Sequence, residues 1–456
     1  MKKKFLLSTL LMLLWIAAPV RAMQAQVVVL QDVHVLSMAD DRVRSGQTVI
    51  ISDGVIAWVG DHADADVPEG ATVVTGEYYV MPGLAEMHAH IPPSTQGEQM
   101  MLDVLALYLA NGITTIRGML GQPAHLELRE RAARGEIVSP RIITSGPSFS
   151  GNSVDSPETG RRMVREQAEA GYDLLKFHPG LTLDQFQAIT EEANGIGIEF
   201  SGHISHAVGL ERSLEAGKGT IDHLDRYMEF LAGDAAGRED PPIIFFGYDL
   251  TPHLDASLIP EAARLTREAG VWNVPTNTLL VNVFDSDLST DEMMAWPGME
   301  FIPPQTSANW AQRVNSIRAG EPYDPDQARR FLELRLEITR ALHEEGAGLM
   351  LGADAPQIFN PPGFSVHREL ALLLDAGLSP FEALKTGTVN VAEYRKKESS
   401  GKIRAGYRAD LVLLTSNPLE SIPFHDRIAG VVSDGRYFSR SDLDALLDDI
   451  RERRQE

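Results

Sequence analysis

Apolar and polar positions follow two different patterns along the chain. From residue 23 to residue 77, short apolar runs are separated by turn signals such as Ser52-Asp53-Gly54. Such runs are typical of strands joined by tight turns. Similar short runs return between residues 396 and 440. We therefore expect the two chain ends to join in one small β-sandwich.

The pattern changes between residues 78 and 395, where apolar strand-like runs alternate with helical stretches. Counting the run that opens at Tyr78 there are eight runs, and helical segments such as 182–194 and 326–345 lie between most of them. Repeated strand–helix units of this number predict a (β/α)8 TIM barrel, whose chemistry lies at the carboxyl ends of the strands. A doubly wound open sheet is the alternative, but no Gly-rich phosphate loop supports it.

Two long connections interrupt this rhythm, at residues 224–259 and 284–325, and both are rich in Pro and aromatic residues. Long barrel loops at the catalytic face are often lids or substrate walls. Peripheral packing or a dimer contact is an equally good interpretation. At the carboxyl end, residues 441–456 place apolar side chains from Leu443 to Ile450 at helical spacing, which predicts a helix that docks on the rest of the protein.

Composition and charge restrict the class of protein. The chain has 456 residues, 43% hydrophobic and 23% charged, which is ordinary for one large and one smaller globular domain. The net charge of -23 argues against nucleic acid and anionic membrane surfaces as partners. Because no cysteine is present, disulfides, a Cys nucleophile and Cys-ligated zinc are excluded. A small-molecule or dipeptide substrate is compatible with these data, and a homo-oligomer stays open.

Residues 1–22 resemble a secretory signal peptide. Three lysines precede an apolar stretch from Phe5 to Ala18, and small residues lead up to Ala22, where a signal peptidase would cut. The apolar stretch is shorter than the roughly 20 residues of a membrane-spanning helix. We expect cleavage after Ala22 and a periplasmic or secreted mature protein without membrane attachment.

Two histidines stand out at the end of the first barrel run. His88 and His90 are two residues apart, so on an extended strand both side chains point to the same face. They could therefore converge on one metal ion. Taken alone, the pair is slightly better explained as strand histidines that face solvent or are hydrogen-bonded in a core.

Later strand-like runs end in further side chains that can bind a metal. These are Lys176, His203, His223 and Asp354. Each has a structural explanation by itself: a surface lysine, a core histidine or a helix cap. The carboxyl ends of barrel strands meet at one rim, so all of these side chains would lie together there. Because all six side chains would lie at the same rim, one metal site explains them better than six independent structural roles do.

The motifs around these residues resemble those of the amidohydrolase superfamily, and the resemblance covers almost the whole chain after residue 22. It is carried by Pro82-Gly83-Leu84 with His88-Ala89-His90, by residues 111–117 (NGITTIR), by Ile221-Asp222-His223, by Leu351-Gly352-Ala353-Asp354 and by residues 406–411 (GYRADL). The branch that these motifs resemble includes Xaa-Pro dipeptidases, imidazolonepropionases and ochratoxin amidases. The resemblance implies a barrel with a β-sandwich beside it and an enzyme that hydrolyses carbon–nitrogen bonds.

The resemblance also implies a centre of two divalent metal ions. Its ligands would be His88, His90, Lys176, His203, His223 and Asp354. The first two histidines and the aspartate would hold one ion, and the other two histidines would hold the second. The lysine would be carboxylated by carbon dioxide, so that its carbamate oxygens bridge both ions. Zinc suits this imidazole-rich set, and manganese or another divalent ion is an alternative.

The mechanism that the resemblance implies is amide hydrolysis. A hydroxide that bridges the two metals would attack the substrate carbonyl. Asp354 would take the proton of that hydroxide and pass it to the leaving nitrogen, acting as general base and then as general acid. The implied substrates are dipeptides of the Xaa-Pro type or N-acyl amino acids.

Two alternatives stay open. Lys176 could be unmodified, with a single metal on His88, His90, His203 and Asp354, as in cyclic-amide hydrolases or deaminases. The protein could also be a metal-retaining binding protein that has lost catalysis, although the presence of Asp354 argues against this.

Six further residues are weaker candidates for substrate contacts. His178 lies two residues after Lys176 and would face the same mouth if the strand continues. His206, which is not counted among these six, is better explained as a cap of the next helix. The remaining five could bind a substrate carboxylate and are equally well explained as structural: Arg117, Tyr227, Tyr248, His367 and Arg368.

Overall fold

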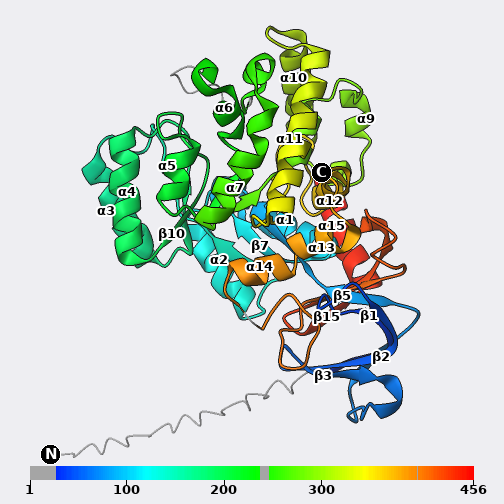
Figure 1. Ribbon diagram of the computed structural model, residues 1–456. Helices are drawn as coiled ribbons and strands as arrows, with labels where there is room; N and C mark the ends of the chain where they lie inside the picture. Colours follow the sequence, from blue (N-terminus) through cyan, green and yellow to red (C-terminus); the bar gives the residue numbers. More distant parts are fainter. Residues whose placement is uncertain (1–26, 237–245, 398, 456) are drawn as a thin grey trace, which may run out of the picture.

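The computed structural model describes residues 27–236, 246–397 and 399–455 (Figure 1). The segment expected to be a signal peptide, residues 1–22, lies outside the described residues. Within the described part, no helix combines the length and apolar character needed to cross a membrane. The fold is mixed α/β, with a sheet built from the chain ends below a larger strand–helix part in Figure 1.

Both chain ends contribute to one sheet, in the order β15-β14-β13-β5-β1-β2-β3, with β4 paired to β1. The expected joining of the ends is present, and the strands form one continuous hydrogen-bonded sheet. The reason is that β5 pairs with β1 on one side and with β13 on the other. Val28, Ile51 and Leu411 belong to the separate apolar core of this sheet. Its strands are β1 (Val28–Leu36), β2 (Val43–Ser52), β3 (Val55–Asp61), β4 (Thr72–Thr75), β5 (Tyr79–Pro82), β13 (Leu411–Leu414), β14 (Ile428–Ser433) and β15 (Arg436–Ser439).

The central part contains parallel strands that alternate with helices. One sheet has the order β6-β7-β8 and another the order β12-β11-β10-β9. Single parallel bridges join the edges of these sheets to each other and to the segment from Leu349 to Ala355. The last predicted strand is therefore present only as a segment held by isolated backbone bonds. The strands are β6 (Leu84–Ala89), β7 (Ile113–Gly118), β8 (Arg141–Thr144), β9 (Leu174–Phe177), β10 (Glu199–Gly202), β11 (Thr220–Asp222) and β12 (Trp272–Val274).

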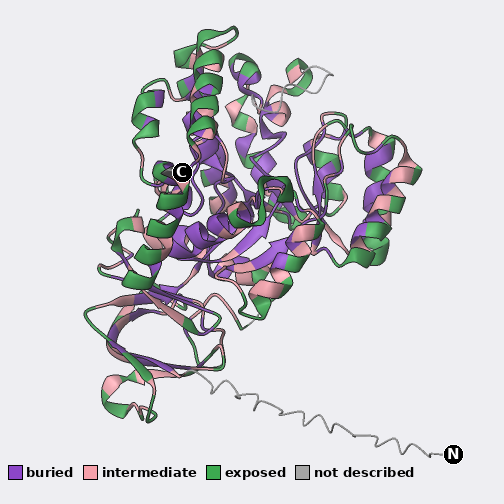
Figure 2. Ribbon diagram, turned by 180° about the vertical axis from the view of Figure 1, so that it is seen from behind, coloured by how far each residue is buried: buried purple, intermediate pink, exposed green. Residues whose placement is uncertain are grey.

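Helices pack around these strands, and the buried residues follow the strands and the inward faces of the helices (Figure 2). The helices predicted at 182–194 and 326–345 are present as α4 and α11. A capping box of Thr182 and Gln185 begins α4, and Gly197 ends it in the left-handed conformation at a φ of 83°. The helices between and after the strands are α1 (Glu98–Ala110), α2 (Pro123–Ala133), α3 (Pro157–Ala170), α4 (Leu183–Ile196), α5 (Gly209–Glu215), α7 (Ile259–Ala269), α11 (Pro325–Glu345), α12 (Phe364–Asp375), α13 (Pro380–Thr386) and α14 (Val389–Tyr394).

The two long connections carry helices of their own. The first contains α6 (Tyr227–Ala232), and the second contains α9 (Thr290–Met294) and α10 (Pro304–Ala319) after α8 (Asn277–Phe284). Figure 1 shows α6, α9 and α10 at the top of the molecule, on the side away from the sheet of the chain ends. The long connections therefore gather at one end of the α/β part.

The last helix, α15 (Arg440–Gln455), packs on α1. Leu443 and Ile450 of α15 are buried. Nη2 of Arg453 donates to Oδ1 of the buried Asp103 on α1 at 2.7 Å. Apolar packing and ion pairing thus attach the C-terminal helix to the α/β part.

Candidate metal centre

The six candidate ligands lie at the carboxyl ends of the parallel strands. His88 is within β6 and Lys176 within β9, while His203 follows β10 and His223 follows β11. His90 comes just after β6, and Asp354 lies in the Leu349–Ala355 segment. The side chain of His90 is 23% exposed, and the others are buried. Strand ends that are far apart in the sequence thus bring six polar side chains into one buried cluster.

Three of these residues form the tightest group. Nε2 of His90 lies 2.7 Å from Oδ1 of Asp354, and Nε2 of His88 lies 3.6 Å from the same oxygen. One ligand atom from each of the three lies within 4.8 Å of the other two. Nζ of Lys176 is 3.4 Å from Nε2 of His88. Two imidazoles and a carboxylate at this spacing fit a divalent metal ion.

The other two histidines pack against this group. The ring centroids of His88 and His223 are 4.4 Å apart, and those of His223 and His203 are 4.5 Å apart. Nδ1 of His203 lies 2.9 Å from Oδ2 of Asp225, and Nδ1 of His223 lies 2.8 Å from Oγ1 of Thr276. Bonds of this kind fix the ring orientation and leave the second nitrogen for a metal. Nε2 is therefore the atom that each ring offers.

A buried ion-pair network orients His88. Oδ2 of Asp222 lies 2.9 Å from Nδ1 of His88 and 4.0 Å from Nζ of Lys176. Oδ1 of Asp222 accepts hydrogen bonds from Nη2 of Arg117 at 3.2 Å and from Oγ1 of Thr220 at 2.7 Å. Because Arg117 and Asp222 are both fully buried, the guanidinium compensates the carboxylate charge next to the cluster.

Burial sets the protonation states of the cluster. It lowers the pKa of His88, His203 and His223 well below the ordinary value, so these imidazoles are neutral, as metal ligands must be. Burial also lowers the pKa of Lys176, which favours its neutral amine. For Asp354, burial alone would raise the pKa, but the neighbouring histidines, His88 first, outweigh it and lower the pKa, so the carboxylate is ionised.

The backbone at two of these residues has an uncommon conformation. φ is 64° at His223 and 62° at Asp354, in the left-handed region that non-glycine residues seldom adopt. Such conformations persist where surrounding contacts hold them, and they are frequent at functional sites. Before His203 stands Gly202, where a Cβ would come within 2.7 Å of Cδ of Lys176. The absence of a side chain there leaves room for the lysine.

A cavity of about 150 Å³ opens onto the cluster. Five of the six candidate ligands line it, all except His223, together with His178, whose pKa burial lowers to about 2. The other lining residues are Leu120, Phe246, Leu279, Leu280, Val283, Arg313, Gln357 and Ile358. Each long connection contributes one residue to the lining: Phe246 from the first and Arg313, on α10, from the second. These two positions therefore favour the interpretation of the long connections as substrate walls.

Five of the weak candidates do not line this cavity, and their assignment as substrate contacts is corrected. They are Arg117, Tyr227, Tyr248, His367 and Arg368. Their polar groups are used inside the protein: Oη of Tyr227 bonds Oγ1 of Thr266 at 2.7 Å, and the guanidinium of Arg368 stacks 3.9 Å from the ring of Trp296. Val208, not His206, occupies the cap of α5.

Eight cavity residues were not among the candidates from the sequence, among them Gln357, Leu120 and Arg313. Gln357 follows Asp354 by three residues and donates from Nε2 to Oδ2 of Asp354 at 2.7 Å, so its proximity in sequence was a usable signal. Leu120 and Arg313 gave no such signal. They reach the cavity from a loop after β7 and from α10, through tertiary folding alone.

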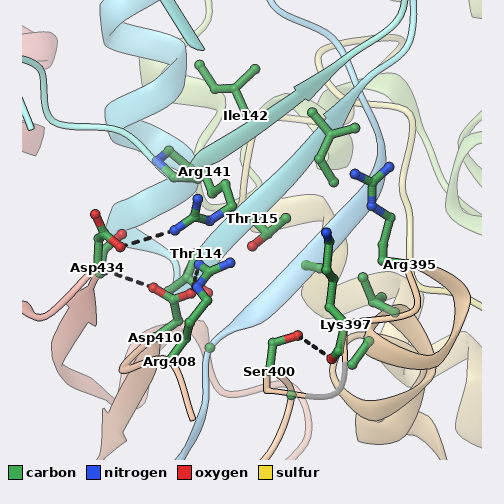
Figure 3. A pocket seen from close by; sticks show the side chains of 18 of the residues that line it. Thr114, Thr115, Arg141, Ile142, Arg395, Lys397, Ser400, Arg408, Asp410 and Asp434 are labelled. Carbon is green, nitrogen blue, oxygen red and sulfur yellow. Dashed lines mark hydrogen bonds and ion pairs between the residues drawn. The ribbon is translucent and has the colours of Figure 1, made fainter. Parts of the chain in front are cut away.

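A larger cavity of about 390 Å³ lies at the opposite ends of the strands, next to β13–β15. It is lined by residues that begin strands, such as Thr114 and Arg141. Figure 3 shows Arg141 with Asp434 and Arg408 with Asp410 on one side, and Arg395 and Lys397 on the other. None of the six candidate ligands lines it. Barrel enzymes carry their chemistry at the other strand ends, so we assign the site to the smaller cavity.

Comparison with known proteins places the chain in a family. The model of the amidohydrolase family matches residues 79–437. Ochratoxinase of Aspergillus niger is 23% identical over 409 residues, which cover 82% of this chain and 78% of the relative. These matches confirm the resemblance inferred from the motifs.

Solved structures agree at the level of the fold. Bottromycin amidohydrolase superposes with a TM-score of 0.72 at 23% identity, covering 94% of this chain and 90% of that structure. A Xaa-Pro dipeptidase with bound methionine in its active site gives a TM-score of 0.65 at 17% identity, covering 91% of this chain and 100% of the other. The chain belongs to the amidohydrolase family, and it is a hydrolase that acts on carbon–nitrogen bonds.

Proposed function

We propose that this protein is an exported, metal-dependent amidohydrolase that cleaves the amide bond of a small substrate through a centre of two divalent metal ions. The observation that carries the proposal is the convergence of His88, His90 and Asp354, with ligand atoms within 4.8 Å, beside Lys176 and two further histidines. Family membership supports the reaction class.

The scaffold of this site is proposed to be a closed (β/α)8 barrel. Parallel bridges at Ser145–Leu174, Asn273–Leu349 and Ala89–Ala355 support closure, because they connect β8 to β9, β12 to the last segment, and that segment to β6. Closure explains why side chains from strand ends far apart in sequence meet at one point. The barrel domain would span residues 78–395, flanked by a β domain from 23–77 and 396–440 and by the helix 441–456.

The donor set fits two metal ions. His88 and His90 with Asp354 would hold one ion, and His203 and His223 would hold the other, all as neutral imidazoles and an ionised carboxylate. Lys176 lies between these groups and would bridge the ions as a carbamate. The neutral amine that burial favours would react with carbon dioxide at Nζ, forming one N–C bond and releasing one proton. Zinc suits this set of ligands.

The protein residues have clear parts in the proposed reaction. Bound divalent ions would supply polarisation of the substrate carbonyl and activation of a water molecule. Asp354, held ionised by its histidine neighbours, accepts a proton from the attacking water and delivers it to the leaving nitrogen. Gln357, which donates to Oδ2 of Asp354, keeps the carboxylate in place between these two steps.

The substrate is proposed to be a dipeptide of the Xaa-Pro type or an N-acyl amino acid. The similar proteins support this range, since one is a Xaa-Pro dipeptidase and another an ochratoxinase. The cavity of about 150 Å³ suits a small molecule. Export is proposed from residues 1–22, with cleavage after Ala22 releasing a periplasmic or secreted enzyme.

The test combines metal analysis with a substrate panel. The protein, loaded with zinc or manganese in bicarbonate, is assayed on Xaa-Pro dipeptides, N-acyl amino acids and lactones, and bound metal is counted per chain. We expect turnover of an amide substrate and two metal equivalents. Lys176→Ala should lose metal and activity, whereas the control Lys402→Ala, in the larger cavity, should retain both. Absence of turnover in a metal-loaded protein would overturn the proposal.

A mononuclear centre is the second candidate, and one observation favours it. Among the described residues, only His88, His90 and Asp354 meet as three ligand atoms within 4.8 Å. A single metal equivalent, together with activity that does not depend on bicarbonate, would assign the protein to this alternative, with a cyclic amide or an amine as the substrate.

A further inference from the structure

Arg313 on α10 is an unpaired cation at the cavity. Its side chain lines the cavity and the residue is exposed. Among the described residues, its guanidinium forms no ion pair or hydrogen bond. Arg318 on the same helix differs, because its guanidinium donates to the backbone carbonyls of Val283 and Asn282 at 2.9 and 3.0 Å. Arg318 therefore fixes α10 in place, and Arg313 is available to a ligand.

Apart from Arg313, His178 and Gln357, the cavity lining outside the ligand cluster is apolar. Leu120 is 46% exposed although it is a large hydrophobic residue. Its φ of 128° is unusual for a leucine. Oγ of Ser145 accepts hydrogen bonds from the amides of Leu120 and Gly121, at 3.0 and 3.2 Å, and holds this conformation. An exposed leucine in a rare backbone conformation suggests selection for contact with a ligand. Further apolar lining comes from Phe246, Leu279, Leu280, Val283 and Ile358.

The other polar side chains that line the cavity contact the candidate metal centre. Nε2 of Gln357 is bonded to Asp354. The imidazole of His178 packs against that of His203, with ring centroids 5.0 Å apart. Lys176 belongs to the candidate metal centre. Among the described residues that line the cavity, Arg313 is thus the one that carries a permanent positive charge outside that centre.

We propose that Arg313 binds the carboxylate of the substrate, so that the enzyme acts on apolar amides that carry a free carboxylate next to the scissile bond. This inference rests on the proposed function and assigns the residue that recognises the carboxylate of the proposed substrates. A guanidinium can bind a carboxylate through two parallel hydrogen bonds. The protein carries a net charge of -23, which by itself disfavours an anionic substrate, so a local cation at the cavity has a specific use.

The experiment compares one substrate in two forms. The best N-acyl amino acid or dipeptide from the panel and its C-terminal amide are assayed with the wild type, Arg313→Met and Arg313→Lys, and release of the N-terminal product is quantified. Methionine keeps an apolar stem without the charge. A hydrogen bond to a charged group contributes about 1.5–3 kcal/mol, so we expect Arg313→Met to raise KM for the acid by about 10- to 100-fold. KM for the amide should change by less than about 2-fold, since no charge pair is lost. For Arg313→Lys, KM for the acid should lie between the values of the wild type and of Arg313→Met.

Controls separate the possible outcomes. Gln312→Met, on the same helix but outside the cavity, should match the wild type on both substrates. If Arg313→Met changes the acid and the amide equally, or changes neither, the inference is overturned while the proposed function stands. If the metal-loaded wild type cleaves no member of the panel in either form, the proposed function fails, and the inference fails with it.

Discussion

The cavity at the strand starts and the cavity at the strand ends differ in size and in what their charged groups do. The larger one, about 390 Å³, lies where strands begin, and its arginines are mostly paired with carboxylates, as Arg141 is with Asp434 and Arg129 with Asp173. The smaller one, about 150 Å³, lies where strands end. There, neutral histidines, an ionised aspartate and a buried lysine face each other. Between these two cavities, volume alone would therefore point to the wrong end of the molecule.

The difference shows what marks a reactive site in this fold. Paired surface charges at the strand starts stabilise the contact with the sheet of the chain ends and need no ligand. At the strand ends, buried titratable groups with shifted pKa values meet where His223 and Asp354 hold left-handed backbone conformations. A strained backbone and buried titratable groups both cost folding free energy. Such features persist where function requires them.

The largest effect is expected for Asp354→Asn. General acid–base groups contribute about 10²- to 10⁴-fold, so we expect kcat to fall by about that factor. Asparagine keeps the shape and one ligand oxygen, so most of the metal should stay bound. The measurement is kcat on the best substrate together with metal content.

The matched control for this variant is Asp434→Asn in the larger cavity, which should keep wild-type kcat. Full activity of Asp354→Asn would show that the proton is moved by another group and would remove the main chemical distinction between the two cavities.

A smaller effect is expected for Asp225→Asn. Oδ2 of Asp225 lies 2.9 Å from Nδ1 of His203 and accepts the amide hydrogen of Ile204 at 3.1 Å, so it orients the ring. Loss of such an outer partner typically lowers metal affinity by about 10- to 100-fold. Competition with a chelator measures the change.

Asp173→Asn offers a control at the opposite strand ends, because Oδ2 of Asp173 accepts from Arg129 and from the amide of Thr144. Its metal affinity should equal that of the wild type. Equal losses in both variants would mean that the effect comes from general destabilisation and not from the orientation of His203.

Glu369 gives the site end of the molecule a pH-dependent stability. Burial raises its pKa to about 7 from an ordinary 4.5, although the amides of Asn277 and Thr278 donate to it at 3.0 and 2.7 Å. Between these two values the folded state binds more protons than the unfolded state. Stability therefore falls as pH rises through this window, by up to about 3 kcal/mol.

Glu369→Gln removes this titration. Denaturant unfolding at pH 4.5 and pH 8 gives the free energy of unfolding at both values. Its decrease from pH 4.5 to pH 8 should be smaller in the variant than in the wild type. The other titratable groups contribute equally to both proteins and cancel when the two decreases are compared. The control Asp434→Asn should lose as much as the wild type. A variant that behaves like the wild type would show that Glu369 is already ionised at the lower pH.

The smallest effect is expected for Arg141→Met in the larger cavity. The side chains of Arg141 and Asp434 are 39% and 54% exposed, so their ion pair should contribute less than about 1 kcal/mol to stability. Activity should change by less than about 2-fold, since this ion pair lies away from the reacting groups. A loss of activity greater than 10-fold, measured at saturating metal, would break the distinction drawn between the two cavities.

Much of the site could be predicted from the sequence because it depends on local spacing. His88 and His90 share a strand face, and the other candidate ligands end apolar runs, so parallel strands whose carboxyl ends meet were enough to predict that these side chains lie together. Five of the six weak candidates for substrate contact do not line the cavity, and the reason is physical. Tyr227 and His367 are polar residues in suggestive places, but sequence spacing does not reveal burial, and the fold buries both in internal hydrogen bonds.

By itself, the sequence determined the strand–helix rhythm, the joining of the two chain ends and the family, because each depends on periodic patterns or on short motifs of adjacent residues. It also indicated the six candidate ligands, which the structure brings into one cluster. Only the tertiary structure decided which long-loop residues reach the cavity and which do not. Arg313 and Leu120 lie far apart in the chain and share no motif, and their meeting depends on how α10 and the loop after β7 pack. Specificity is decided by such packing, since contacts between distant segments form only when the whole chain has folded.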